Sequence, residues 1–278
     1  MIVNKEGFDR MRSIKNRKTS LGLIILVYYL VTSIGALLLG FVQPALGVPE
    51  VVIQLTQFGP ALGVLSILLL WPRERQQMIN LDFRYWPLKP RKLISLAVLI
   101  AGTFAAAWLW YAVTGHSVAY TSPASLSHPF WIIVVAQFIG AAGEEVGWRC
   151  FLQPTLQSRI GTFPASIVVG IVWGVWHIGV FAEGWVYASL FILFAVALSV
   201  ILGELLSDAR GGRLLLATSC HALFNLGLLL WFNEEDGSRL AMGTLATACA
   251  IAAVIVMAIR RGKRAGTSAV HLQTKSAR

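Results

Sequence analysis

The chain has 278 residues, of which 56% are hydrophobic and only 13% are charged. Because soluble domains carry about 25% charged residues, this composition indicates a membrane protein and excludes a soluble enzyme built around one large core. The net charge of +10 is compatible with nucleic-acid binding, but the positions of the basic residues explain it otherwise, so nucleic acid is not expected as a partner.

The apolar segments predict the fold class. A transmembrane helix needs about 20 mostly apolar residues. The first apolar run is longer than the h-region of a signal peptide (about 7 to 15 residues), so we expect an uncleaved span there. The chain is therefore predicted to be all-α, a polytopic membrane helical bundle of about eight transmembrane helices in one integral membrane domain, residues 1–278. In chain order the predicted spans are 20–42, 50–71, 93–113, 130–152, 164–182, 185–206, 214–232 and 240–259.

The basic residues predict the orientation. Residues 1–19, 72–92 and 260–278 each hold six Lys or Arg, and only Arg239 lies on the other side, in the acidic loop "NEEDGSR". Four more basic residues are predicted in loops on the same side as the termini: Arg149, Arg159, Arg210 and Arg213. The positive-inside rule then predicts that 1–19 and 262–278 are cytoplasmic tails of a multi-pass protein in a bacterial cell membrane. Anionic membrane lipids are expected partners of this charge.

Charged side chains within a span are costly and are functional candidates by default. On the fourth predicted span, Glu145 and Arg149 are four residues apart, so they share a helix face and can pair with each other. Glu144 has no partner at that spacing. It must find one on another helix or in a water-filled cavity.

Two further spans carry polar pairs at the same spacing. Trp173 and His177 share a face of the fifth span, and His221 and Asn225 share a face of the seventh. Such groups could activate water: the carboxylate takes a proton, the imidazoles hold the water, and the amide binds an oxyanion. The alternative is a catalytic zinc held by Glu144, His177 and His221, since two histidines and a carboxylate suit such a site.

A helical rise of about 1.5 Å per residue tests whether these groups meet. Glu144 lies about 21 Å from Phe130, in the inner third of the membrane, whereas His177 lies about 20 Å from Pro164 and is expected farther outward. Glu204 and Asp208 are read as a solvated helix end. The three cysteines have no CxxC spacing and are read as small hydrophobic residues.

The residues of these three clusters resemble known motifs. "EEVGWR" looks like the EExxxR motif of the CPBP family of intramembrane proteases, also called Abi proteins, which process CAAX proteins and bacteriocins. "WGVWH" resembles the family's FxxxH motif, with Trp173 where phenylalanine is usual, a departure expected to affect packing rather than chemistry. "HALFN" resembles its HxxxN motif, and the similarity covers roughly residues 135–230.

The resemblance implies an intramembrane endopeptidase (hydrolase), glutamic or metallo in type, whose site opens toward the cytoplasm. Glu144 is implied as the water-activating base, His177 and His221 as holders of water or zinc, and Asn225 as oxyanion partner. Glu145, Arg149 and Trp173 would support the site. Implied substrates are peptides or membrane proteins, prenylated CAAX proteins among them.

Two other functions stay open at this point. One is a non-enzymatic membrane immunity or scaffolding protein, in which the polar cluster only packs helices. The other is an ion-coupled transporter, against which stand the absence of an internal repeat and of paired, broken spans.

Overall fold

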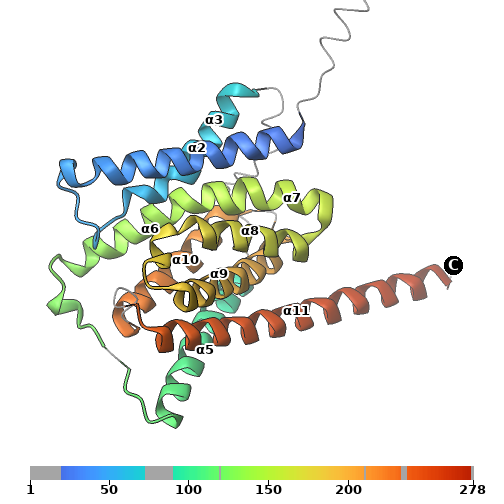
Figure 1. Cartoon of the computed structure of the whole chain (residues 1–278). Helices are drawn as coiled ribbons and strands as arrows, with labels where there is room; N and C mark the ends of the chain where they lie inside the picture. Colours follow the sequence, from blue (N-terminus) through green and yellow to red (C-terminus); the bar gives the residue numbers. More distant parts are fainter. Residues whose placement is uncertain (1–19, 73–89, 119, 210, 233–236, 277–278) are drawn as a thin grey trace, which may run out of the picture.

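The computed structural model describes residues 20–72, 90–118, 120–209, 211–232 and 237–276, with side chains up to residue 262. Within these ranges the regular elements are all helical, which confirms the all-α prediction (Figure 1). The principal helices are α2 (Leu21–Val42), α3 (Gly59–Leu70), α5 (Pro90–Val113), α6 (Phe130–Gly147), α7 (Gln153–Ile160), α8 (Thr162–Trp176), α9 (Trp185–Leu206), α10 (Arg213–Trp231) and α11 (Arg239–Ser276). The short ones are η1 (Pro44–Leu46), η2 (Leu55–Phe58), η3 (Pro123–Ser125), the π-helix η4 (Trp148–Leu152) and η5 (Ile178–Phe181).

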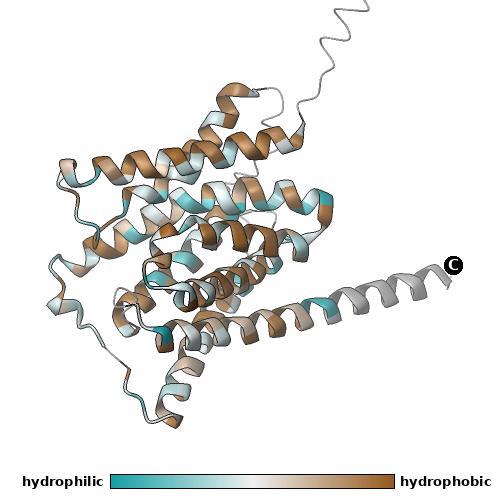
Figure 2. Ribbon diagram, viewed as in Figure 1, coloured by the Kyte–Doolittle hydropathy of each residue, from teal (hydrophilic) through white to brown (hydrophobic). Residues whose placement is uncertain are grey.

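Every predicted span corresponds to a helical segment. In the described part of the chain, six helices are long and apolar enough to cross a membrane, and the segments Leu55–Leu70 and Thr162–Trp176 are apolar but shorter. Hydrophobic residues, brown in Figure 2, make up most of the length of these helices. The chain is therefore a multi-pass integral membrane protein.

Several predicted features lie at or beyond the edge of the described residues. The tail 1–19, most of the basic segment 72–92 and the acidic residues 233–236 are outside them. At the other end, α11 continues as a helix to Ser276, so the predicted carboxy-terminal tail is helical over most of its length.

The connectivity gives the bundle two faces. The basic face, named for the predicted charges, carries the start of α2 and α10 and the ends of α3, α7 and α9. The far face carries the end of α2, the start of α6, α9 and α11, and η5. In Figure 1 the far face is on the left and the basic face on the right.

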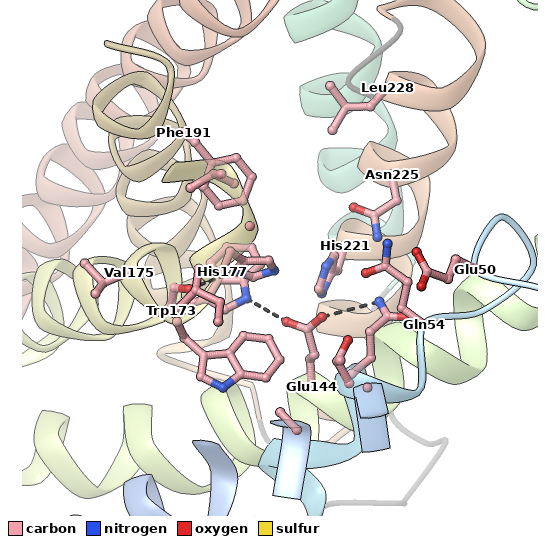
Figure 3. A pocket seen from close by; sticks show the side chains of 18 of the residues that line it. Glu50, Gln54, Glu144, Trp173, Val175, His177, Phe191, His221, Asn225 and Leu228 are labelled. Atoms are coloured by element: carbon pink, nitrogen blue, oxygen red, sulfur yellow. Dashed lines mark hydrogen bonds between the residues drawn. The ribbon is translucent and has the colours of Figure 1, made fainter. Parts of the chain in front are cut away.

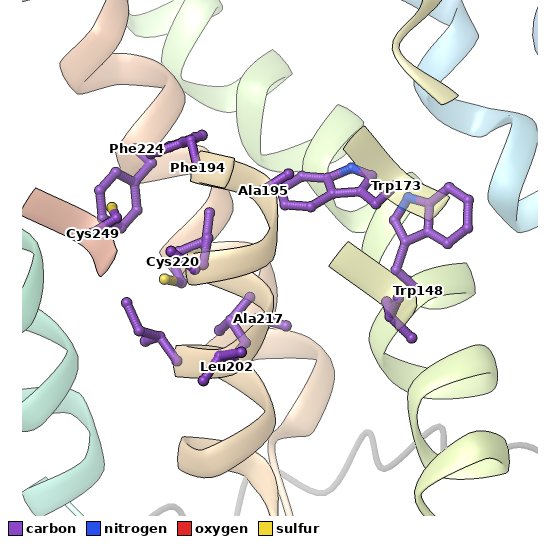
Figure 4. Packing of buried hydrophobic residues seen from close by; sticks show 14 of the residues in the cluster. Trp148, Trp173, Phe194, Ala195, Leu202, Ala217, Cys220, Phe224 and Cys249 are labelled. Carbon is purple, nitrogen blue, oxygen red and sulfur yellow. The ribbon is translucent and has the colours of Figure 1, made fainter. Parts of the chain in front are cut away.

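The core of the bundle is apolar and includes the cysteines. Cys220 and Cys249 lie among Phe194, Leu202 and Phe224 between α9, α10 and α11 (Figure 4). All three cysteines are free and buried, and burial raises the cost of a thiolate. They pack as small hydrophobic residues, as predicted.

Glycines on α6 let the amino-terminal helices come close. A Cβ at Gly140 would collide with the Gln57 carboxamide, and one at Gly147 would collide with Pro60 and the Tyr28 hydroxyl. The stretch Gly59–Leu70 can therefore lie against α6, and η2 brings Gln57 beside the middle of that helix.

Candidate active site

A cavity of about 820 Å³ lies between α2, η2, α6, α8, η5, α9 and α10. Glu144, His177, His221 and Asn225, the four residues predicted as catalytic, all line it. Figure 3 shows His177 and His221 on either side of Glu144, with Phe191 and Leu228 farther along the cavity. The structure thus brings the three motifs to one place, while the roles of the residues stay predictions.

Glu144 has partners on two other segments. Its side chain is only 1% exposed. Trp173 Nε1 donates a hydrogen bond to Oε2 at 2.7 Å, and Gln57 Nε2 donates one to Oε1 at 3.3 Å. Hydrogen bonds to a carboxylate favour its ionised form and fix its orientation. Each oxygen keeps a lone pair for water.

Glu145 and Arg149 pair as predicted. Arg149 Nη1 donates to Glu145 Oε1 at 3.0 Å, and both side chains are fully buried. The same oxygen lies 2.9 Å from His221 Nδ1. The Arg149 guanidinium also lies over the Trp173 ring, 4.3 Å from its centroid. Arg149 is therefore an internal cation in the π-helix and not the loop charge predicted from the sequence.

In both histidines, ring atom Nδ1 faces an oxygen that accepts a hydrogen bond. His177 Nδ1 lies 2.8 Å from the carbonyl oxygen of Trp173, and His221 Nδ1 lies 2.9 Å from a carboxylate oxygen. Because a carbonyl and a carboxylate only accept hydrogen bonds, each Nδ1 must carry the proton and donate. In the neutral ring, Nε2 then keeps its lone pair for a water or another donor.

The apparent difference in depth between Glu144 and His177 disappears in the structure. The fourth span continues through η4 and α7 to Ile160 rather than ending near residue 152. Glu144 lies about 24 Å from Ile160 along this helix. His177 lies about 22 Å from Thr162, the first residue of α8, which runs back in the opposite direction. The two residues are therefore level. α8 ends at Trp176, and His177 is the C-cap residue of this helix.

Asn225 is one helical turn from His221 on α10. Its Nδ2 donates to Gln137 Oε1 at 3.1 Å, which leaves one N–H of the amide for another acceptor. Both residues line the cavity.

Sequence reasoning missed Gln57 and Gln137. The motif resemblance covers only roughly residues 135–230, yet η2, which precedes that region, supplies a donor to Glu144. The loop before it is tied by Gln43, whose amide bonds the carbonyls of Val48 and Ile53 and the N–H of Leu55 at 2.8–3.1 Å. Intramembrane glutamines were the available signal, but only charged residues and polar pairs four residues apart had been considered.

The structure also changes the role of Trp173. Its replacement of the usual phenylalanine was expected to affect packing alone, but its indole N–H is a hydrogen-bond donor to Glu144. The ring also lies 5.2 Å from the His221 ring.

The candidate zinc site has no geometric support. Among the described residues no group of three His, Cys, Asp or Glu is arranged to hold a metal ion. Zinc binding by Glu144, His177 and His221 therefore stays a prediction.

The second acidic cluster lies outside the cavity. Asp208 pairs with Lys92 at 2.8 Å and with Arg260 at 2.9 Å, joining the end of α9 to α5 and α11. Asp208 is exposed, as expected of a solvated helix end, but Glu204 is buried. These ion pairs link α5, α9 and α11 on the basic face.

Known proteins resemble the region that holds the site. Residues 126–227 match the family described as type II CAAX prenyl endopeptidase Rce1-like. Relatives include lysostaphin resistance protein A from the Staphylococcus aureus strains bovine RF122 / ET3-1, Newman and USA300, each 29% identical over 254 residues. The alignment covers 86% of this chain, which spans 58% of the length of these curated relatives.

At the family level, the match supports a membrane protease or processing protein. The matched range includes all three motifs and most of the cavity wall on α6, α8, α9 and α10. The resemblance to the CPBP family of intramembrane proteases, predicted from these motifs, is therefore confirmed by the family match over residues 126–227.

Proposed function

We propose that the protein is an intramembrane endopeptidase in which Glu144 activates the water that hydrolyses a peptide bond. The observation that carries the proposal is the position of Glu144. Its buried carboxylate is held by two donors and faces a cavity shared with two imidazoles. A general base must lie within hydrogen-bond reach of its water, and a fixed carboxylate in a cavity of this size meets that need.

The proposed reaction begins with transfer of a water proton to Glu144. The water oxygen bonds to the scissile carbonyl carbon, and the carbonyl oxygen becomes an oxyanion that the remaining N–H of Asn225 stabilises. Glu144 then gives its proton to the amide nitrogen, the C–N bond breaks, and an acid and an amine leave. The water donates its second O–H to Nε2 of His177 or His221, so one imidazole at a time orients it.

Glu145 and Arg149 act through other residues. Glu145 fixes the His221 tautomer, and Arg149 neutralises Glu145 and supports the Trp173 ring. A buried ion pair that loses one partner leaves an uncompensated charge. Glu145 and Arg149 therefore act by holding His221 and Trp173 in position.

We further propose that both termini face the cytoplasm of a bacterial cell. The basic residues at 1–19, 72–92 and 260–278 support this through the positive-inside rule. The substrates proposed are peptides or membrane proteins, prenylated proteins included, because the family match names a CAAX prenyl endopeptidase.

The test compares Glu144→Gln with Glu183→Gln, a matched change of an exposed glutamate on the same cavity. Comparative proteomics of membranes carrying wild-type or Glu144→Gln protein identifies a substrate that accumulates, and a quenched peptide spanning its cleavage site becomes the reporter. Loss of the base should lower turnover about 10²- to 10⁴-fold. Glu183→Gln should keep kcat within about threefold of wild type, whatever its effect on KM, because a rim carboxylate is exposed and does not contact the water at Glu144.

Retained turnover in Glu144→Gln would refute the proposed base. The non-enzymatic alternative makes a different prediction for a His177→Ala and His221→Ala double variant. If that variant is normally abundant and folded yet keeps the cellular function, the polar cluster only packs helices.

A further inference from the structure

We propose that the cavity receives its substrate from the far face, the side of the membrane opposite to the basic termini, as an internal peptide segment carrying basic residues. This rests on the proposed function and on the proposed orientation, under which the far face is extracytoplasmic. The resemblance implies a cytoplasmic opening, so the inference departs from it.

The first observation is where the cavity reaches the surface. From Glu144 its lining continues to the end of α2 at Phe41, to Glu50 before η2, to Ile178 in η5, to Glu183 before α9, and to Leu229 near the end of α10. All of these positions belong to the far face, and Phe41 and Ile178 are 80% and 65% exposed. Among the described residues, none from the loops of the basic face lines the cavity.

The second observation is that the other side of Glu144 is closed. Between Glu144 and the basic face, the helices are packed by Tyr28, Trp148, Arg149 and Phe151, none of which is exposed. Tyr28 contacts the Trp148 ring edge-on and lies 4.7 Å from the Phe151 ring, centroid to centroid. Protein interiors packed in this way leave no path for a peptide. The described structure therefore connects Glu144 to the far face only.

The third observation concerns charge. Three carboxylates line the cavity, Glu144 at the bottom and Glu50 and Glu183 at the rim, and no described lining residue is Lys or Arg. Figure 3 shows Glu50 close to the cavity. A free carboxy terminus would meet no Lys or Arg among the described lining residues, Arg239 lying beside Gly184 but outside the lining. Lys or Arg flanking a scissile bond would meet two carboxylates. The chemistry thus favours cleavage inside a chain over release of a short carboxy-terminal fragment, so among the substrates proposed above it favours peptides and membrane proteins over prenylated carboxy termini.

The orientation can be measured without any cleavage. Gly179 lies at the rim and Gly262 on the opposite face, both are exposed, and a Cβ at either meets nothing within 4 Å. Gly179→Cys and Gly262→Cys are therefore matched variants, and the three native cysteines, being buried, give little background. A membrane-impermeant maleimide is added to spheroplasts, before and after permeabilisation.

We expect Gly179→Cys to react in intact spheroplasts and Gly262→Cys to react only after permeabilisation. The reverse order, or equal reaction of both in intact spheroplasts, would overturn the inference. Failure of Gly179→Cys to react even in detergent would also overturn it, because the rim would then be closed.

The charge preference is measured by protection in Gly179→Cys combined with Glu144→Gln, so that nothing is cleaved. The probes are two capped peptides with the same apolar centre, one flanked by lysines and the other by glutamates. The lysine peptide should slow labelling of the cysteine at a concentration about 3- to 10-fold lower than the glutamate peptide requires. This ratio is expected for two exposed ion pairs. Adding Glu50→Gln and Glu183→Gln should remove the difference.

Equal protection by the two peptides, or stronger protection by the glutamate peptide, would refute the preference. These results are distinct from failure of the proposed function. Correct labelling and protection together with an active Glu144→Gln enzyme would reject the base and retain the route of entry.

Discussion

Replacing Trp173 by phenylalanine tests the hydrogen bond that the sequence did not predict. The change restores the residue usual in the resembling motif and keeps an aromatic ring below the Arg149 guanidinium, so the bundle should fold. It removes one donor, the indole N–H that lies 2.7 Å from Glu144 Oε2. The carboxylate then keeps only the longer bond from Gln57, at 3.3 Å.

The expected size follows from the charge of the acceptor. A hydrogen bond to a charged group contributes about 1.5–3 kcal/mol, which corresponds to about a 10- to 150-fold decrease in kcat if the bond holds the base in place for reaction. KM should change less than kcat, because the indole N–H bonds the base and not the substrate. The assay is single-turnover cleavage of the reporter peptide by protein in liposomes, with Tm measured in parallel.

Trp176→Phe is the matched control. Trp176 also lines the cavity, but its ring contacts Trp148 and His177 rather than the Glu144 carboxylate. If Trp173→Phe keeps kcat within about twofold of wild type, or if both variants lose the same amount, the indole bond has no special role and the reasoning fails.

Three other predictions follow from the contacts described. Gly140→Ala should displace the flexible Gln57 carboxamide, lowering kcat about 3- to 10-fold with little change in Tm, and Gly22→Ala, whose Cβ meets nothing, should match wild type; equal kcat in both would contradict the Gln57 contact. Dialysis against a chelator should leave turnover unchanged, and a loss restored by zinc would instead support a metal site. The hydrogen bond from Arg260 holds the pKa of Asp208 below its usual range. The stability that ionised Asp208 adds to the folded protein is therefore fully present above about pH 4 and is lost as the pH falls further. Asp208→Asn should therefore lower stability at pH 7 by about 1 kcal/mol or less, and thermal unfolding that shows the same difference at pH 7 and pH 2 would refute this linkage.

The helical bundle was predictable because a span is a local property. About 20 apolar residues suffice to identify a membrane helix, whatever its neighbours are. The ends of the spans were less predictable. The fourth was expected to stop near residue 152, but η4 and α7 carry it to Ile160. Polar residues such as Gln153 and Gln157 lowered the apolar signal there, although the helix continues.

The motif residues were predictable for a similar reason, since spacing within one helix fixes which side chains share a face. The Glu145–Arg149 pair is such a case. Residue spacing gives no such information about contacts between different helices. Gln57 is 87 residues from Glu144 in sequence, and their approach depends on the missing side chain of Gly140. The donor role of Trp173 was missed because its indole N–H points to another helix.

Arg149 sets the distance between two walls of the cavity. One of its nitrogens holds Glu145, which holds the imidazole of α10, while its flat face rests on the indole of α8. Lysine at this position would preserve the charge but not the planar surface that lies over the indole. The gap in which a water molecule would stand between α8 and α10 thus depends on the flat shape of one guanidinium group as well as on its charge.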